Sequence, residues 1–170
     1  MMASPRAGTA HDPGARGQVS VSGPRVYLLP GEFAVSGCPC TLATIVGSCL
    51  AVCLRDPVLR IGGLSHHLLP RAPWWQRSSR FGDVAVSMLI DALAQLGAVP
   101  ERLEARIYGG ACVLTPHRAH AAHVGRRNAT EALGVLDAAR IGVVAMDVGG
   151  DHGRRVEFNP HAGSFAVVRL

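Results

Sequence analysis

Residues 41–54 read Thr41-Leu42-Ala43-Thr44-Ile45-Val46-Gly47-Ser48-Cys49-Leu50-Ala51-Val52-Cys53-Leu54, and the fold is best predicted outward from them. One apolar run ends at Val46, the small residues Gly47 and Ser48 follow, and a second apolar run begins directly after Cys49. Short apolar runs bounded by small residues are typical of buried strands. We therefore predict two strands joined by a tight turn that carries Cys49.

A tight turn of this kind can leave the backbone N–H of its cysteine free to donate to an oxyanion. Most free cysteines are small buried side chains rather than nucleophiles, so the turn alone leaves both roles open. A nucleophilic thiol needs a base at neutral pH because its ordinary pKa is about 8.5, and histidine is the usual base. His66 and His67 are the candidates here.

A third apolar run, at residues 60–64, predicts a hairpin with the run at residues 50–54. In this hairpin the start of the first strand lies opposite the end of the second, which would place Cys49 near Ser65 or His66. Side chains alternate along a strand, so His66 and His67 point to opposite faces and only one of them can face the thiol. The pattern does not choose between them.

Further patterns along the chain predict the other strands and two helices. Residues 26–29, 42–46, 50–54 and 60–64 are predicted to be adjacent strands of one sheet, and further strands are expected at 103–108, 141–148, 154–159 and 164–169. The apolar residues Val86, Leu89, Ile90, Leu93 and Leu96 lie on one helical stripe, with Asp83 at its start and Gly97 at its end. Asn128-Ala129-Thr130-Glu131 matches an N-cap with its capping-box acid and predicts a second helix to about Ala139. The fold class is therefore α/β, a layered domain in which a mixed β-sheet packs with helices.

The length and composition fit one domain of 170 residues, of which 48% are hydrophobic. Residues 1–24 contain few large apolar side chains and are expected to form a disordered tail ahead of a domain at 25–170. Five cysteines, no secretory apolar segment and no run of about 18 apolar residues favour a reduced, cytoplasmic protein without membrane insertion. The net charge of +5 comes entirely from arginine, but scattered aromatic residues argue against nucleic-acid binding.

Several motifs occur in one order along the chain, and together they are more specific than any single tripeptide. They are Pro30-Gly31-Glu32-Phe33-Ala34-Val35, Gly47-Ser48-Cys49, Gly62-Gly63-Leu64-Ser65-His66-His67, Arg80-Phe81-Gly82-Asp83, Ile107-Tyr108-Gly109-Gly110-Ala111, Gly125-Arg126-Arg127-Asn128, Asp147-Val148-Gly149-Gly150 and Gly153-Arg154-Arg155-Val156. In these stretches the sequence resembles the CheD family, the chemoreceptor glutamine deamidases of bacterial chemotaxis.

The resemblance implies that Cys49 is the nucleophile and that His66, rather than His67, is its base. It also implies a threonine as third member of the site, for which Thr44 and Thr41 are both candidates. Gly47 and Ser48 form the turn, and the N–H groups near Ser48 and Cys49 would bind the oxyanion. Such chemistry needs neither a metal nor an organic cofactor. The expected partners are the cytoplasmic helices of methyl-accepting chemotaxis receptors and a CheC-like phosphatase.

Two other functions are compatible with the same fold. A non-catalytic adaptor would bind receptors or a CheC-like protein without using Cys49, and a cysteine protease or transamidase would share the thioester chemistry. Trp74 and Trp75 could hold the substrate or pack within their loop. Arg126, Arg127, Arg154 and Arg155 form a candidate docking surface for an acidic receptor.

Three remaining patterns point elsewhere only weakly. His117, His120 and His123 recur at a spacing that aligns poorly on a helix, so a zinc site is not favoured. Cys38-Pro39-Cys40 lacks the spacing of a redox motif and is interpreted as a turn. Gly109-Gly110 and Gly149-Gly150 do not match phosphate-binding loops and are interpreted as tight turns that, by the resemblance, border the active-site cleft.

Overall fold

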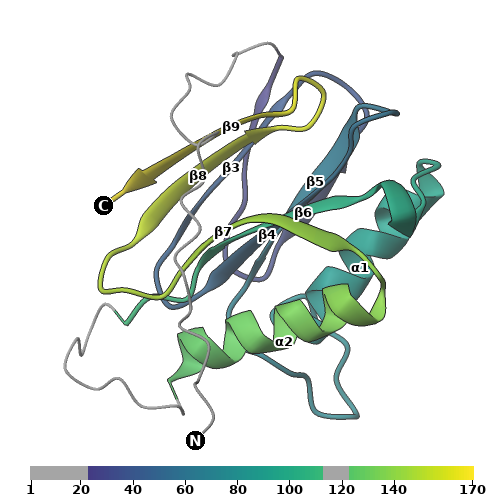
Figure 1. Ribbon diagram of the computed structural model, residues 1–170. Coiled ribbons are helices and arrows are strands. Elements are labelled where there is room, and N and C mark those ends of the chain that lie inside the picture. Colours follow the sequence, from purple (N-terminus) through teal and green to yellow (C-terminus); the bar gives the residue numbers. More distant parts are fainter. Residues whose placement is uncertain (1–22, 113–122) are drawn as a thin grey trace, which may run out of the picture.

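The computed structural model describes residues 23–112 and 123–170, and these residues form three layers (Figure 1). A four-stranded sheet covers one face of a five-stranded sheet, and two helices cover the other face. The predicted tail at 1–24 lies outside the described residues except for its last two positions. The strands are β1 (Arg25–Tyr27), β2 (Phe33–Ser36), β3 (Thr41–Val46), β4 (Leu50–Asp56), β5 (Ile61–His67), β6 (Glu104–Gly109), β7 (Gly142–Val148), β8 (Arg154–Asn159) and β9 (Ser164–Arg169).

The two sheets divide the strands in a way that the sequence did not predict. The first sheet has the order β1-β3-β8-β9 and the second has the order β2-β5-β4-β6-β7. The expectation that the first four predicted strands are neighbours in one sheet is therefore wrong, because β1 and β3 belong to the first sheet and β4 and β5 to the second. The chain crosses from one sheet to the other at the turn of Gly47, Ser48 and Cys49. The layered α/β class itself is confirmed.

Two apolar clusters fill the spaces between the layers. Between the sheets lie Leu42, Val46, Ala51, Leu64 and Phe158, among others. A second cluster lies between the five-stranded sheet and the helices. It includes Leu50, Val52 and Leu54 of β4, Leu89 and Leu93 of the first helix, and Leu136 of the second. Alternate residues of β4 thus serve different clusters, as the two-residue period of a strand requires.

The first helix, α1, runs over Gly82–Gln95 and confirms the predicted helix, with Val86, Leu89 and Leu93 of the stripe buried. The predicted last member, Leu96, is instead the C-cap residue and is exposed. Asp83 lies in its first turn, where a negative charge stabilises the helix by interacting with the positive end of the helix dipole. Gly97 follows the helix with φ of 94°, a left-handed conformation that glycine adopts without strain.

The second helix, α2, spans Val124–Ala138 and begins earlier than predicted. Its N-cap is His123, whose side chain accepts a hydrogen bond from the backbone N–H of Gly125. The prediction of Asn128 as N-cap is therefore wrong, and Asn128 lies fully buried one turn inside the helix. Its amide bonds to carbonyl groups of other segments, so the capping signal was a coincidence of residue types.

Two short elements were not predicted at all. Strand β2 pairs with β5 at the edge of the five-stranded sheet, and its four residues are only half-buried. A 3₁₀ helix, η1, covers Pro100–Arg102. Elements this short leave too few residues for a clear period. None of the helices in the described residues is long and apolar enough to span a bilayer.

Candidate active site

The turn that carries Cys49 is held by the carbonyl oxygens of its three residues. The Gly47 carbonyl accepts from the N–H of Ala111 at 2.8 Å, and the Cys49 carbonyl accepts from the N–H of Gly110 at 2.8 Å. The Ser48 carbonyl accepts from the side-chain amide of Asn128 at 3.1 Å. Gly109 makes this close approach possible, because a Cβ there would lie 2.3 Å from the Cys49 carbonyl oxygen.

The hairpin of β4 and β5 brings the histidines to the same end of the sheet as the turn. The predicted hairpin is confirmed, with Ala51 opposite His66 and Leu50 opposite His67. The register is shifted from the predicted one, in which Cys49 lay near Ser65 or His66. His66 shares a face with Ala51, which packs between the two sheets, and Cys49 packs against the same cluster. Cys49 and His66 therefore belong to the inter-sheet side.

His67 belongs to the opposite side of the sheet. Its partner Leu50 packs toward the helices, and a Cβ at Gly82, the first residue of α1, would lie 2.9 Å from His67 Nε2. The side chain is fully buried, and burial lowers its pKa to about 3. His67 is thus a neutral side chain packed beneath the start of α1.

Thr44 connects His66 to the four-stranded sheet. Its Oγ1 lies 2.8 Å from His66 Nδ1 and also donates to the Leu28 carbonyl at 2.8 Å. Because a hydroxyl has one proton and the carbonyl can only accept, the Thr44 oxygen must accept from the Nδ1–H of His66. This fixes the tautomer of the neutral ring and leaves the lone pair on Nε2. Thr41, the other candidate, has a buried hydroxyl without a hydrogen-bond partner.

The surroundings favour a neutral resting pair. Burial raises the pKa of the Cys49 thiol above its ordinary value, although the residue's own N–H acts in the opposite direction. Burial lowers the pKa of His66, and the Leu28 carbonyl and the Glu32 carboxylate offset only part of this effect. Both directions disfavour a thiolate–imidazolium pair before substrate binds. His66 Nε2 is buried and lacks a hydrogen-bond partner, so it is available to accept a proton.

The backbone of His66 is fixed by the segment that precedes β2. The N–H of His66 donates to the Glu32 carbonyl at 2.9 Å, and the N–H of Gly31 donates to the His66 carbonyl at 2.7 Å. The Glu32 carboxylate closes its own turn by accepting from the N–H of Leu29. The motif at residues 30–35 thus has a structural role that the sequence pattern did not reveal.

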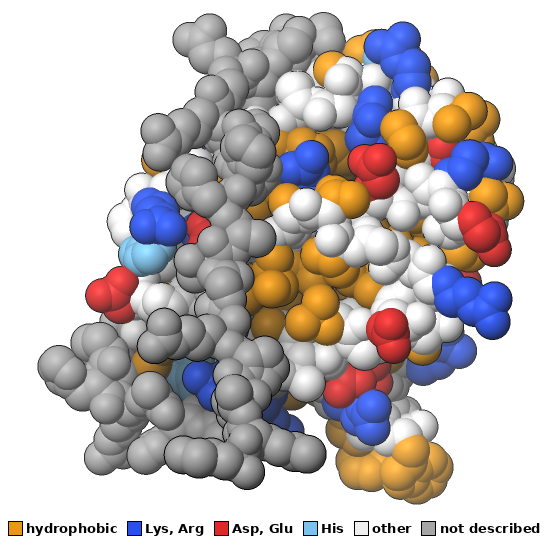
Figure 2. Space-filling view, in the orientation of Figure 1, with side chains coloured by type: hydrophobic (Ala, Val, Ile, Leu, Met, Phe, Trp, Pro, Cys, Tyr) orange, Lys and Arg blue, Asp and Glu red, His pale blue; other side chains and the backbone are white. Residues whose placement is uncertain are grey.

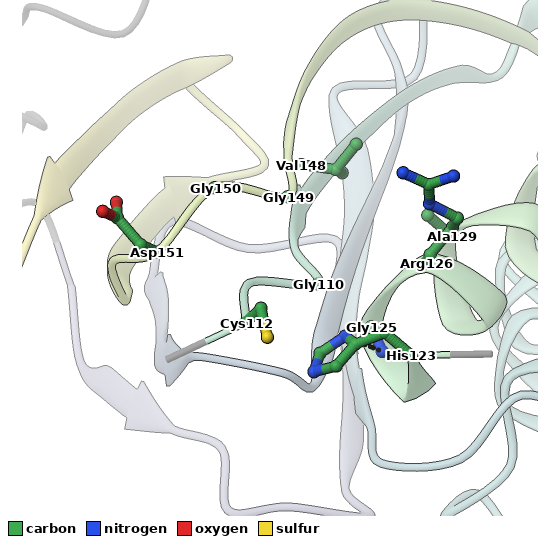
Figure 3. Close-up of a pocket in the computed structure, with 10 residues that line it drawn as sticks. All are labelled: Gly110, Cys112, His123, Gly125, Arg126, Ala129, Val148, Gly149, Gly150 and Asp151. Carbon is green, nitrogen blue, oxygen red and sulfur yellow. Dashed lines mark hydrogen bonds between the residues drawn. The ribbon is translucent and has the colours of Figure 1, made fainter. Parts of the chain in front are cut away.

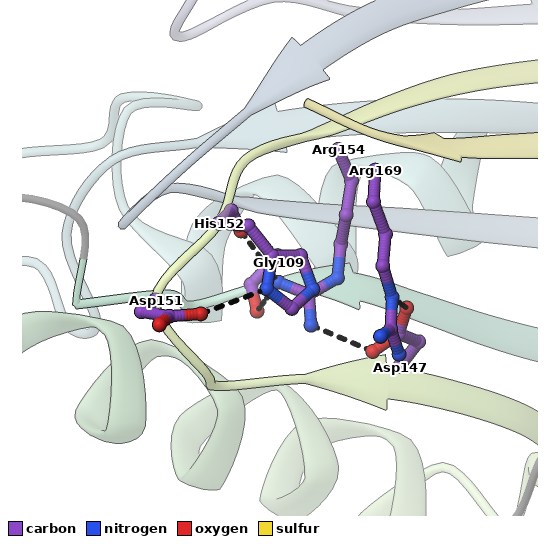
Figure 4. A network of polar contacts seen from close by, with 6 residues as sticks. All are labelled: Gly109, Asp147, Asp151, His152, Arg154 and Arg169. Carbon is purple, nitrogen blue, oxygen red and sulfur yellow. Dashed lines mark hydrogen bonds and ion pairs between the residues drawn. The ribbon is translucent and has the colours of Figure 1, made fainter.

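Arg154 is a buried connection between the two sheets (Figure 4). From β8 it donates to Asp147 of β7 at 2.6 Å, and it also contacts the carbonyls of His152 and Gly109. Asp147 in turn lies 4.0 Å from Arg169. The interpretation of Arg154 as a docking residue is therefore wrong, since only 1% of it is exposed. Arg126, Arg127 and Arg155 are exposed and remain candidates.

A pocket of about 580 Å³ lies behind the 109–111 segment (Figure 3). Gly110, Gly149 and Gly150 line it, with Arg126 on one side and Asp151 on the other. Neither Cys49 nor His66 is among the described residues of its wall. Across residues 23–112 and 123–170, no group of three His, Cys, Asp or Glu side chains could hold a metal ion. Of the histidines in the weak zinc pattern, His117 and His120 lie outside the described residues.

Comparison with known proteins places the chain in a family. The family described as CheD chemotactic sensory transduction matches residues 68–169. The chain belongs to the CheD family. A relative from Anaeromyxobacter dehalogenans, named probable chemoreceptor glutamine deamidase CheD 1, is 42% identical over 168 residues, which are 99% of this chain and 94% of the relative. A relative from Rhizobium leguminosarum, named probable chemoreceptor glutamine deamidase CheD, is 42% identical over 82% of this chain and 76% of the relative. A relative of the same name from Bordetella petrii is 39% identical over 86% of this chain and 67% of the relative.

The structure of this CheD family member joins Thr44 to His66 by a hydrogen bond and places Cys49 against the same inter-sheet cluster that their strands face, and the sequence singled out all three residues. It leaves Thr41 and His67 apart from them. Sequence reasoning missed Asn128, whose amide holds the Ser48 carbonyl, and Gly31 and Glu32, which hold the His66 backbone. All three occur in motifs that carried the family resemblance, so the only signal for them was the resemblance itself.

Proposed function

We propose that this chain deamidates glutamine side chains of chemoreceptors to glutamate, with Cys49 as nucleophile, His66 as base and Thr44 as the residue that orients the base. The 2.8 Å contact between Thr44 and His66 Nδ1 carries this proposal, because it leaves Nε2 as the free base on the side of the sheet that Cys49 occupies. The printed names of the relatives, chemoreceptor glutamine deamidase, support the same activity.

The first half of the reaction forms a thioester. His66 Nε2 takes the proton of the Cys49 thiol as the sulfur attacks the carboxamide carbon of glutamine. The carbonyl oxygen becomes an oxyanion, which the N–H groups of Ser48 and Cys49 would stabilise. When the tetrahedral intermediate collapses, the protonated His66 gives its proton to the nitrogen, which leaves as ammonia.

The second half releases the product. His66, neutral again, takes a proton from a water molecule that attacks the thioester carbon. Collapse of the second intermediate breaks the carbon–sulfur bond, leaves glutamate on the receptor and returns the thiol. The neutral pair described above suits this sequence, because His66 must start each half-reaction as a base.

The substrate class suggests where the protein works and what it meets. Glutamines in the cytoplasmic helices of methyl-accepting receptors would require a cytoplasmic enzyme, and a CheC-like phosphatase is a further candidate partner. The loop between β5 and α1 offers a contact surface, since Trp74 is 92% exposed and Trp75 70% exposed. Hydrophobic side chains protrude at the lower end of the molecule in Figure 2, where this loop lies in Figure 1. On the face shown in Figure 2, basic side chains are interspersed with acidic ones rather than gathered in a stripe.

The proposal is tested by incubating the protein with a cytoplasmic receptor fragment and measuring the fragment's mass. Each converted glutamine should add about one dalton, and Cys49→Ala and His66→Ala should both abolish the gain. His67→Gln is the matched control, because it changes the neighbouring histidine on the other face and should retain activity in whatever fraction folds.

The alternatives give different results in the same experiment. Receptor binding without any mass change would support a non-catalytic adaptor and contradict the proposal. Cleavage of the fragment, or incorporation of an added amine, would indicate a protease or a transamidase.

A further inference from the structure

Asn128 lies on α2 but makes its hydrogen bonds outside the helix. Its side chain is fully buried, and its Nδ2 donates to the Ser48 carbonyl at 3.1 Å and to the Leu68 carbonyl at 2.9 Å. Ser48 precedes the nucleophile, and Leu68 follows His66 by two residues. One amide therefore ties together the two chain segments that carry the thiol and its base.

The orientation of this amide is fixed by its partners. Both partners are carbonyl oxygens, which only accept, so the side chain must turn its NH₂ group toward them. Its Oδ1 is buried and has no hydrogen-bond partner. A buried polar atom left without a partner costs free energy. The arrangement thus keeps two donor bonds at the expense of one acceptor, which fits a side chain selected for donating.

The bond to Ser48 also fixes the direction of the next N–H. In a trans peptide the C=O and N–H groups point in opposite directions. The Ser48 carbonyl points toward α2, so the N–H of Cys49 points away from α2 and toward the inter-sheet side. Among the turn and loop bonds of the described residues, the N–H groups of Ser48 and Cys49 donate to no backbone carbonyl. The Cys49 N–H instead favours negative charge on its own sulfur.

We propose that Asn128 is a positioning residue that aims the Cys49 N–H at the oxyanion of the reaction. The inference rests on the proposed function for the identity of the reaction, but it concerns any acyl transfer to Cys49. Without the amide, the 48–49 peptide can rotate and its N–H no longer meets the developing charge. Loss of one oxyanion donor typically slows a reaction about 10²- to 10³-fold.

The test compares two reactions of the same thiol. Acylation by p-nitrophenyl acetate passes through an oxyanion: the sulfur attacks the acetyl carbon, p-nitrophenolate leaves, and an acetyl thioester remains on Cys49. Alkylation by iodoacetamide displaces iodide and forms no oxyanion. In Asn128→Leu, which has a similar branched shape but no donor, we expect acylation of Cys49 to slow about 100-fold while alkylation stays close to that of the unmodified chain.

Each modification is located by peptide mass spectrometry, with Cys49→Ala as the blank, because Cys38 is also exposed. Leu136→Ala is the matched control, since it loosens the same helix without touching the turn. Should Asn128→Leu not fold, Asn128→Ala serves the same comparison. In Leu136→Ala any change should affect acylation and alkylation alike. The inference is overturned if acylation is unchanged in Asn128→Leu, or if acylation and alkylation fall there by the same factor.

The same measurements separate this inference from the proposed function. A chain that acylates at Cys49 in an Asn128-dependent manner but never deamidates a receptor fragment would refute the proposed function and support the inference. Equal deamidation of receptors by the unmodified chain and by Asn128→Leu would support the proposed function and refute the inference.

Discussion

Replacing Thr44 by valine tests the orientation of His66 most directly. Valine keeps the shape of the side chain but removes the oxygen that accepts from Nδ1–H and donates to the Leu28 carbonyl. Leaving a buried polar group without its partner costs about 1–3 kcal/mol. The free Nδ1–H can approach the Leu28 carbonyl, so we expect a total loss of unfolding free energy within about 1–3 kcal/mol. For a domain of this size the melting temperature should fall by roughly 3–9 °C.

The effect on catalysis follows from the same hydrogen bond. In the proposed mechanism, a ring that turns toward Leu28 in Thr44→Val would carry Nε2 away from the position from which it takes the thiol proton. Loss of orientation worth about 1–3 kcal/mol in the transition state lowers kcat about 5- to 150-fold. The assay is ammonia release from a receptor fragment at saturating concentration, with KM measured separately. KM should change little, because Thr44 is fully buried and does not reach the surface.

Two further substitutions make the prediction specific. Thr44→Ser retains the hydroxyl and should recover most of the activity. Thr41→Val is the matched control on the same strand: its hydroxyl is buried without a partner, so removing it should leave activity intact and stability equal or higher. Turnover by Thr44→Val at the rate of the unmodified chain would contradict this role of Thr44, and so would loss of activity in a folded Thr41→Val.

Three other predictions follow from the geometry and the charges. Because burial raises the pKa of Cys49 and lowers that of His66, alkylation of Cys49 by iodoacetamide should keep accelerating up to and beyond pH 9.0; a plateau across the neutral range would indicate a resting ion pair instead. Gly109→Ala should abolish activity and lower the melting temperature, since φ is 113° and the new Cβ would meet the Cys49 carbonyl, whereas Gly134→Ala, with open space on α2, should stabilise by about 0.5–1 kcal/mol. The hydrogen bond from Arg154 lowers the pKa of Asp147 in the folded chain. The ion pair therefore stabilises the fold above the unfolded pKa of 3.8, and this stabilisation is lost as pH falls through the lower folded pKa. Denaturation curves of Asp147→Asn and the unmodified chain should thus converge in acid and differ at neutral pH.

Local patterns were sufficient for the elements with a clear period. The stripe from Val86 to Leu93 predicted α1 because Val86, Leu89 and Leu93 are buried in the core and Ile90 is partly buried against it. The hairpin of β4 and β5 was also predictable, since only four residues separate the two strands. In both cases the partners are close in sequence, so the local pattern contains the information that decides the structure.

The assignment of strands to sheets could not be read from the sequence. β3 ends only a few residues before β4 begins, yet β3 pairs with β8, more than 100 residues later. Both strands are mostly buried, with Ile45 the one exposed residue of β3, so their patterns resemble those of neighbours in one sheet. What separates them is the turn at Gly47–Cys49, whose carbonyls bond to the 110–111 segment and to α2. Those partners lie far away in the sequence.

The choice between His66 and His67 depends on the same long-range information. Alternation places the two rings on opposite faces of β5, but both faces are covered, one by the four-stranded sheet and one by α1. Only the first cover supplies a polar partner to a ring nitrogen, because Thr44 reaches across from β3, while both nitrogens of His67 are buried without one. A base must hold one defined tautomer to present its lone pair reliably, and a hydrogen bond at the other nitrogen is what fixes it. The catalytic candidate is therefore set by β3 of the four-stranded sheet, a strand that precedes the histidines by about 20 residues and does not pair with β5.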